Sequence, residues 1–251
     1  MPMPIRMTVA NNNDQDHMPG NSIVPHNVNS TIIDLGLSLP YGELAKLYRN
    51  IETALPDRQC RVIQFVSAYK GEGASTVAFE MAVIAARMMG KRVLFIDTSA
   101  SQASTSAILP EDVGIPLETM LLSGRPPYEA LAQANGTELY LARLHERGEN
   151  ELPPASLNVM EEAIEHMKPM FDFIVIDSQG VLKDAFGIAF AKLADGSILV
   201  VEAERTRAPV VLETKRMLES GGGNVIGSVL SKRRFYIPKF LYRILYPHDE
   251  V

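Results

Sequence analysis

The stretch SAYKGEGAST, from Ser67 to Thr76, has nearly every feature of a phosphate-binding loop. An apolar run at 62–66 precedes it and is typical of a buried strand, and an apolar segment at 77–89 follows it and is typical of a buried helix. Together a strand, a glycine turn and a helix N-terminus form an anion site, because loop N–H groups point inward and the helix dipole adds positive charge. The residues predicted to bind nucleotide phosphate are Lys70, Gly71, Glu72, Gly73, Ala74, Ser75 and Thr76.

One residue of the usual loop pattern is missing. In G-x-x-x-x-G-K-[ST], Gly73 is the second glycine and the next residue is lysine, but this chain has Ala74. That lysine neutralises charge on the transferred phosphate, so its absence predicts weak catalysis. Lys70 is the obvious substitute and resembles the extra lysine of the MinD/ParA-type loop, although it lies four rather than five residues before position 74. An ordinary glycine turn is the alternative interpretation.

Two later runs, RVLFID at 92–97 and FDFIVID at 171–177, each end in a carboxylate. In a parallel sheet these ends meet at the edge that carries the loop. We therefore expect Asp97 and Asp177 to lie at the phosphate site.

The three motifs in this order resemble the tyrosine-kinase module of bacterial polysaccharide biosynthesis, the CpsD/CapB/Wzc-type family, over about 41–246. In that family the second motif continues as D-x-D-x-R. Here Asp97 matches the first Asp, while Ser99 and Ser101 replace the second Asp and the Arg. The family's T-P-P after the third motif is replaced by 178–180, Ser-Gln-Gly.

The resemblance implies roles for the remaining polar residues. Asp97 is the catalytic candidate if the protein is active, and Ser75, Asp97 and Asp177 are the candidates for Mg²⁺ bound with ATP or ADP. Whether nucleotide binds stays open because the loop lysine is absent, although backbone N–H groups also hold phosphate.

The early helix KLYRNIETAL at 46–55 resembles the family helix that carries E-x-x-R-x-x-R, the motif of ring self-assembly. Those positions hold Lys46, Arg49 and Glu52, so two of the three charges are reversed. A register one turn earlier, which begins at Glu43, restores the signs but spoils the surrounding match. Homo-oligomerisation therefore stays open.

Composition is that of one folded domain: 251 residues with 46% hydrophobic content, enough for a sizeable core. The single cysteine, Cys60, excludes an internal disulfide and suits a reducing compartment. No apolar run reaches the length of about 18 residues that spans a membrane, and no signal peptide is evident. A net charge of −6 argues against nucleic acid as a partner. A cytoplasmic protein, peripheral to the inner membrane, is expected.

Three regions are predicted: a disordered N-terminal tail at 1–30, an α/β domain at 31–234 and a basic, aromatic C-terminal tail at 235–251. The domain is expected to be a mostly parallel sheet with helices on both faces, the P-loop NTPase fold of the deviant Walker type. The predicted strands are 62–67, 92–97, 138–143, 172–177, 196–202 and 225–230, and the predicted helices are 41–54, 75–89, 156–168 and 208–220.

Near the C-terminus, basic residues alternate with bulky ones. Such a segment docks on the core, lies against anionic lipid or the cytoplasmic part of a membrane protein, or carries autophosphorylated tyrosines. The candidate contact residues are Arg233, Arg234, Tyr236, Lys239, Tyr242 and Arg243.

Three functions follow from the resemblance. The favoured one is a non-catalytic or weakly catalytic regulator that binds an inner-membrane polysaccharide co-polymerase in exopolysaccharide biosynthesis or export. The alternatives are an active ATP-dependent protein-tyrosine autokinase that controls chain length, and a MinD/ParA-like positioning ATPase.

Overall fold

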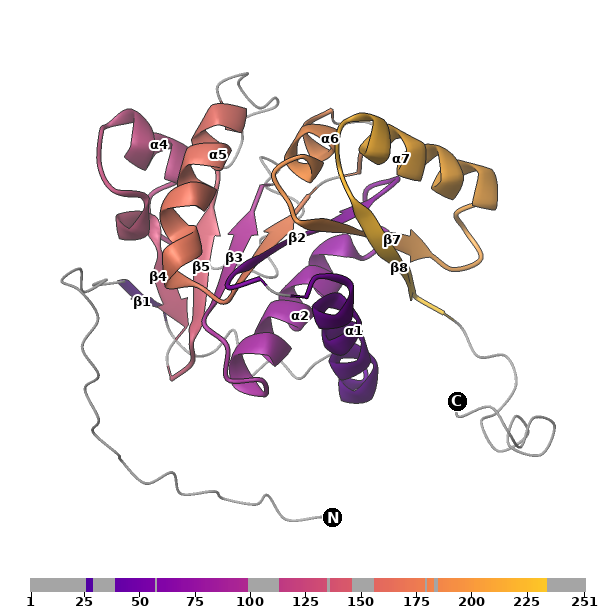
Figure 1. Cartoon of the computed structure of the whole chain (residues 1–251), viewed down its shortest axis with the longest axis horizontal. Coiled ribbons are helices and arrows are strands. Elements are labelled where there is room, and N and C mark those ends of the chain that lie inside the picture. Colours follow the sequence, from indigo (N-terminus) through magenta and orange to yellow (C-terminus); the bar gives the residue numbers. More distant parts are fainter. Residues whose placement is uncertain are drawn as a thin grey trace, which may run out of the picture.

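The computed structural model describes residues 26–28, 39–56, 58–98, 113–134, 136–145, 156–178, 180–182 and 185–233. Within these ranges a single sheet of eight strands forms the centre of the molecule, in the order β1-β4-β5-β3-β6-β2-β7-β8 (Figure 1). Every neighbouring pair is parallel except β4 and β5, which are antiparallel. The predicted mostly parallel α/β fold is thus confirmed.

The strands of the sheet are β1 (His26–Val28), β2 (Arg61–Ser67), β3 (Val93–Asp97), β4 (Ala132–Ala134), β5 (Leu139–Arg143), β6 (Phe173–Asp177), β7 (Gly196–Glu202) and β8 (Val225–Ser231). The helices are α1 (Tyr41–Ala54), α2 (Ala74–Arg87), α4 (Leu117–Leu122), α5 (Ser156–Met167), α6 (Phe186–Ala191) and α7 (Ala208–Ser220), with 3₁₀ turns η2 (Pro127–Ala130) and η3 (Lys168–Met170).

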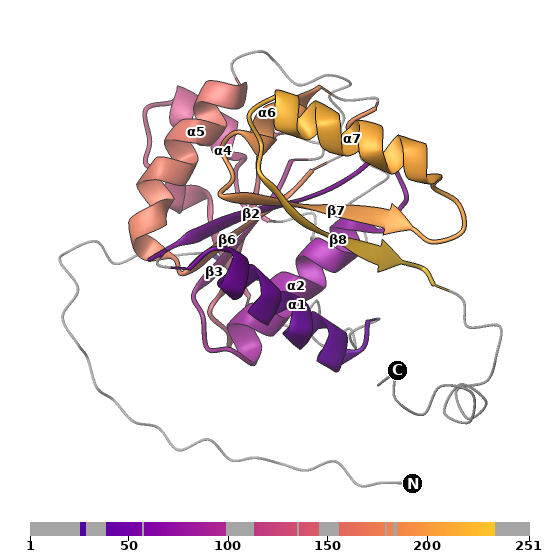
Figure 2. The same cartoon turned by 45° about the vertical axis from the view of Figure 1, so that its right-hand side comes forward.

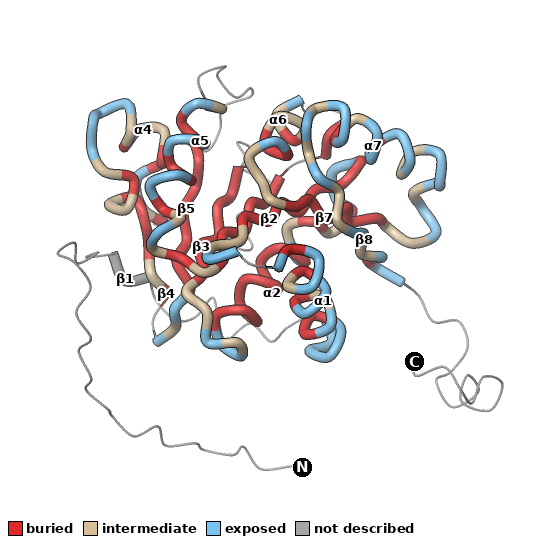
Figure 3. Tube along the Cα trace, in the orientation of Figure 1, coloured by how far each residue is buried: buried red, intermediate tan, exposed pale blue. Residues whose placement is uncertain are grey.

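Helices cover both faces of the sheet (Figures 1 and 2). α1 and α2 lie on one face, and α4, α5, α6 and α7 lie on the other. Successive strand residues serve opposite faces: Ile63 and Phe65 of β2 pack in the cluster with α1 and α2, whereas Val62 packs in the cluster with α5. Figure 3 shows that the central strands are buried, which agrees with their largely apolar sequences, because a strand covered on both faces buries the side chains of both.

The central helix α2 is the most buried helix of the fold as described. Eleven of its fourteen residues are buried, and its N-terminus follows the loop that leaves β2. A helix that is apolar on all sides is held between other elements, here between the sheet and α1. Tertiary packing therefore fixes the position of the loop at its N-terminus.

Four short elements of the described structure lie outside the predicted ones: β4, α4, α6 and the 3₁₀ turn η2. In addition, β1 pairs in parallel with β4 and lies inside the segment expected to be a disordered tail. The rest of 1–38 and residues 234–251, including Arg234, Tyr236, Lys239, Tyr242 and Arg243, lie outside the described residues, so both tail assignments stay predictions.

Candidate nucleotide site

The phosphate loop runs from the end of β2 to the start of α2. Gly71 and Gly73 have φ of +89° and +94°, a left-handed conformation that side chains rarely adopt. Gly73 is the N-cap of α2; it provides no side-chain cap, and the first turn holds no acidic residue. The N–H groups at this helix start therefore have no capping side chain, and the binding of an anion there stays a prediction.

Two carboxylates lie beside the loop at the ends of adjacent strands. Asp97 ends β3 and Asp177 ends β6; their Cα positions are register partners, and the residues are 2% and 3% exposed. Burial raises the pKa of Asp177 well above its usual range, the charge of Asp97 raises it further, and a hydrogen bond from the Ser75 side chain partly opposes both effects. The structure thus brings Ser75, Asp97 and Asp177 together.

These oxygens fit a hard divalent cation. Oδ1 of Asp177 is buried and has no hydrogen-bond partner among the described residues, an arrangement that a bound cation would satisfy. Mg²⁺ binds through one or two carboxylates and relies on phosphates and water for its remaining ligands. In the described part of the chain, moreover, no group of three or more His, Cys, Asp or Glu side chains could hold a metal alone. Mg²⁺ bound there would act through its charge on the phosphates.

The loop position that is lysine in the usual pattern holds a small buried residue in this chain. Ala74 is the first residue of α2 and is 7% exposed, so position 74 carries no charge into the site. Lys70 is an exposed loop residue, and its role as the substitute cation stays a prediction. The substituted family positions Ser99, Ser101 and Gln179 lie outside the described residues.

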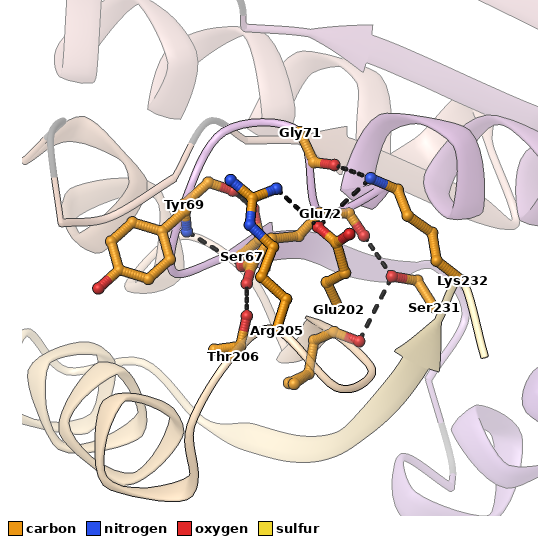
Figure 4. Close-up of polar contacts among 10 residues, drawn as sticks. Ser67, Tyr69, Gly71, Glu72, Glu202, Arg205, Thr206, Ser231 and Lys232 are labelled. Atoms are coloured by element: carbon orange, nitrogen blue, oxygen red, sulfur yellow. Dashed lines mark hydrogen bonds and ion pairs between the residues drawn. The ribbon is translucent and has the colours of Figure 1, made fainter. Parts of the chain in front are cut away.

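The side chain of Glu72 contacts protein rather than solvent. Its carboxylate accepts hydrogen bonds from the Tyr69 N–H, at 3.0 Å, and from the Thr206 hydroxyl, and the residue is 1% exposed (Figure 4). Glu72 is therefore a buried link between the loop and the turn after β7. Only its backbone N–H remains for the phosphate binding predicted at this position.

A second segment supports the loop from the β6 side. Val181 N–H donates to the Ser67 carbonyl at 3.0 Å, and a Cβ added to Gly180 would lie 2.8 Å from the Tyr69 carbonyl carbon. Glycine at 180, where the family has proline, thus allows the backbone to approach the loop closely.

The sequence analysis missed two polar groups at the same sheet edge. Arg143 ends β5, is 7% exposed and is the register partner of Asp97, so a buried basic residue ends the strand beside β3. His145 lies two residues further along the chain. Its Nδ1 is 2.5 Å from Oε2 of Glu118, at the start of α4. The predicted strand 138–143 ends in Arg143, as the predicted strands of Asp97 and Asp177 end in their carboxylates. This shared position at a strand end could have identified Arg143 as a candidate site residue. Nothing local indicated the histidine–glutamate pair.

The fold and this loop define a P-loop NTPase-like protein, and the comparisons with solved structures agree. The kinase domain of Escherichia coli tyrosine kinase ETK has a TM-score of 0.68 at 17% identity, covering 89% of this chain and 86% of that one. The chimerical protein CapA2B2 has a TM-score of 0.68 at 20% identity, covering 84% and 95%. MinD of Pyrococcus horikoshii OT3, complexed with Mg-ADP, has a TM-score of 0.57 at 23% identity, covering 74% and 77%. At these identities the likeness shows the fold.

Sequence comparison finds bacterial tyrosine kinases of the CpsD/YwqD/CapB type as homologues. The chain is 28% identical to tyrosine-protein kinase YwqD of Bacillus subtilis (strain 168) over 187 residues, 74% of this chain and 78% of YwqD. It is 29% identical to the succinoglycan biosynthesis transport protein ExoP of Rhizobium meliloti (strain 1021) over 207 residues, 77% of this chain but only 25% of ExoP. The homologues are thus tied to exopolysaccharide biosynthesis.

No protein-family model matches the chain. Among the described helices, none combines the length and apolar character needed to cross a bilayer.

Proposed function

We infer that this chain is a non-catalytic or weakly catalytic relative of the bacterial tyrosine kinases. It takes ATP or ADP with Mg²⁺ at the phosphate loop and regulates exopolysaccharide biosynthesis or export by binding the cytoplasmic part of an inner-membrane polysaccharide co-polymerase. In this role it acts at the membrane surface.

Ala74 is the observation that carries this proposal. The loop, its two positive-φ glycines and the oxygens of Ser75, Asp97 and Asp177 are present, and this supports binding of phosphate and Mg²⁺ at the loop. The cation that stabilises the transferred phosphate is replaced by a methyl group. Losing one preorganised charge contact lowers a rate by on the order of 10²–10³.

The homologues support a role in polysaccharide assembly. ExoP is by name a succinoglycan biosynthesis transport protein, and this chain spans about a quarter of its length. The chimerical CapA2B2 shares the fold. Both fit a protein that works beside a second, membrane-bound component.

One observation favours the active alternative. Arg143 is a buried arginine at the β5 position that pairs with Asp97, and it is therefore the candidate to supply the positive charge that Ser101 lacks. An active protein would use Asp97 to activate the tyrosine hydroxyl and Arg143 to neutralise phosphate charge.

Phosphotyrosine on the purified full-length protein distinguishes the two functions. We expect autophosphorylation in Mg-ATP on the order of 10²-fold slower than that of a CpsD-type kinase, and no recovery in Ala74→Lys, since positions 99 and 101 stay uncharged. Asp97→Asn is the control for background signal. Robust autophosphorylation that Asp97→Asn abolishes would contradict the non-catalytic role.

A further inference from the structure

The end of β8 reaches across the sheet edge to the phosphate loop. Ser231, the last residue of β8, donates a hydrogen bond from its hydroxyl to the Glu72 carbonyl. Lys232 follows it and donates from its ammonium group to the Gly71 carbonyl. Figure 4 shows both residues contacting the loop from the same side. Two successive loop carbonyls are therefore held by two successive residues of another strand.

These contacts determine where the loop N–H groups point. In a trans peptide the carbonyl of one residue and the N–H of the next lie on opposite sides of the chain. Because the carbonyls of Gly71 and Glu72 face β8, the N–H groups of Glu72 and Gly73 face away from it. Amides at these positions are among those that a phosphate-binding loop directs at its anion.

Lys232 is held in a conformation that has an energetic cost. Its φ is +52°, in the left-handed region that residues other than glycine seldom occupy. Such a conformation persists where surrounding contacts hold it, and it is enriched at ligand clamps. The contacts that hold Lys232 are the Gly71 carbonyl and the carboxylate of Glu202, 3.3 Å from its ammonium group.

Glu202 serves as the counter-ion of this arrangement. Its Oε2 also lies 2.9 Å from Arg205, so one carboxylate receives two cations. Desolvation would raise the pKa of Glu202, but hydrogen bonds from Arg205 and Lys232 outweigh it and lower the pKa. Glu202 therefore stays ionised at neutral pH and keeps the ammonium group of Lys232 beside the loop.

We propose that Lys232 is a positioning residue of the phosphate loop, which holds the Gly71 carbonyl outward so that the following amides are set to receive the phosphates of a nucleoside diphosphate or triphosphate. The proposal rests on nucleotide binding at the loop and is independent of the membrane partner. Since Ala74 leaves the loop without its internal lysine, a preset amide arrangement lowers the ordering cost that a bound phosphate must overcome.

Isothermal titration of the full-length protein with Mg-ADP and with Mg-pyrophosphate tests this role. Lys232→Met is expected to weaken both ligands by about tenfold or more, while Lys232→Arg, which reaches the same carbonyl, stays within about threefold of wild type. Arg205→Gln is the matched control: it removes the other cation on Glu202, and in the described structure Arg205 makes no hydrogen bond to the loop. It is expected to stay within about twofold.

Several outcomes overturn the proposal. Unchanged affinities in Lys232→Met do so, as does a loss for ADP but not pyrophosphate, which would place Lys232 at the base or ribose instead. Wild-type protein that binds neither ligand also overturns it, while the co-polymerase role, read by membrane fractionation, would stand. If Lys232→Met does not fold, Lys232→Gln carries the test, because its shorter side chain takes the ammonium group away from the Gly71 carbonyl; wild-type affinity for both ligands in that variant overturns the proposal.

Discussion

At the scale of single residues, the site contains a buried carboxylate whose negative charge is unfavourable unless a cation lies beside it. Asp177 is 3% exposed, and its Oδ1 lacks a hydrogen-bond partner within the described structure. Burial and then the charge of Asp97 raise its pKa, so the folded protein holds the Asp177 proton more tightly than the unfolded chain does. This difference stabilises the fold fully below the unfolded pKa, near 3.9, and is lost as the pH rises through the raised value.

The first prediction follows from the raised pKa of Asp177, which makes its ionised form destabilising in the folded protein. Asp177→Asn is expected to increase the free energy of unfolding at pH 7 by on the order of 1–3 kcal/mol, because it removes a buried charge while Ser75 can still donate to the amide oxygen. The gain should shrink as the pH falls toward about 4. Urea denaturation between these pH values, without Mg²⁺ or nucleotide, measures it. A variant that is less stable at pH 7, or a gain that does not vary with pH, would contradict the argument.

Residue patterns predicted one half of the site and not the other. The loop follows one predicted strand, and the two carboxylates are the last residues of two others. Parallel strands bring their carboxyl ends to one edge, so the sequence predicts that these groups lie together. Contacts of the loop with Thr206, Ser231 and Lys232 join residues that are 134, 159 and 161 positions apart. No local spacing encodes such pairs. They depend on β7 and β8 lying beyond β2 in the sheet.

At the scale of elements, the long runs were predictable because each buries apolar residues on both faces. The strand predicted at 172–177 is β6 at 173–177, and the helix predicted at 208–220 is α7 with those same bounds. The missed elements β4, α4 and α6 have three, six and six residues, too few to establish a period. β4 forms by pairing with β5 across a turn in which Gly136 has φ of +71°, so its strand conformation comes from tertiary pairing.

A buried amide joins three elements beneath the site. Gln64 of β2 is fully buried; its Nε2 donates to the Ser178 hydroxyl at 2.9 Å and the Gly187 carbonyl at 2.6 Å, and its Oε1 accepts from Ser197 at 2.9 Å. These contacts link β2 to the segment after β6, to α6 and to β7. A fully satisfied polar network of this kind fixes the relative positions of its elements.

The second prediction is that Gln64→Met lowers the free energy of unfolding by about 2–5 kcal/mol. Methionine nearly preserves the volume but leaves the buried partners without hydrogen bonds, each at a cost of about 1–3 kcal/mol. Ile63→Val, at the adjacent fully buried position, is the control, with an expected loss of about 0.5–1.5 kcal/mol from packing alone. Chemical denaturation of both variants decides the matter. If Gln64→Met costs no more than Ile63→Val, the network does not hold these elements together.

At the scale of the whole molecule, the fold is similar to that of the ETK kinase domain, while the loop position that is lysine in the usual pattern is Ala74. A sheet in which both faces are covered keeps its structure whether or not Ala74 replaces lysine, because the core on each side is independent of the loop's charge. Selection for contact with a partner would preserve the framework and tolerate this loss. The proposed contact is made by the basic and aromatic residues from Arg233 onward, of which the structure describes Arg233.

The last prediction separates contact from chemistry in cells. Deleting residues 235–251 is expected to release most of the protein from the membrane fraction and to reduce exopolysaccharide, because the deleted segment provides cations and apolar side chains together. Asp97→Ala, at equal protein level, is expected to leave polymer output nearly unchanged, since a binding role does not need this carboxylate. A shorter deletion, of residues 247–251, removes two acidic residues and no cation except the histidine, and serves as the matched control. If Asp97→Ala abolishes polymer at normal protein level, or if the protein lacking 235–251 still fractionates with membranes and supports polymer, then chemistry rather than contact carries the function.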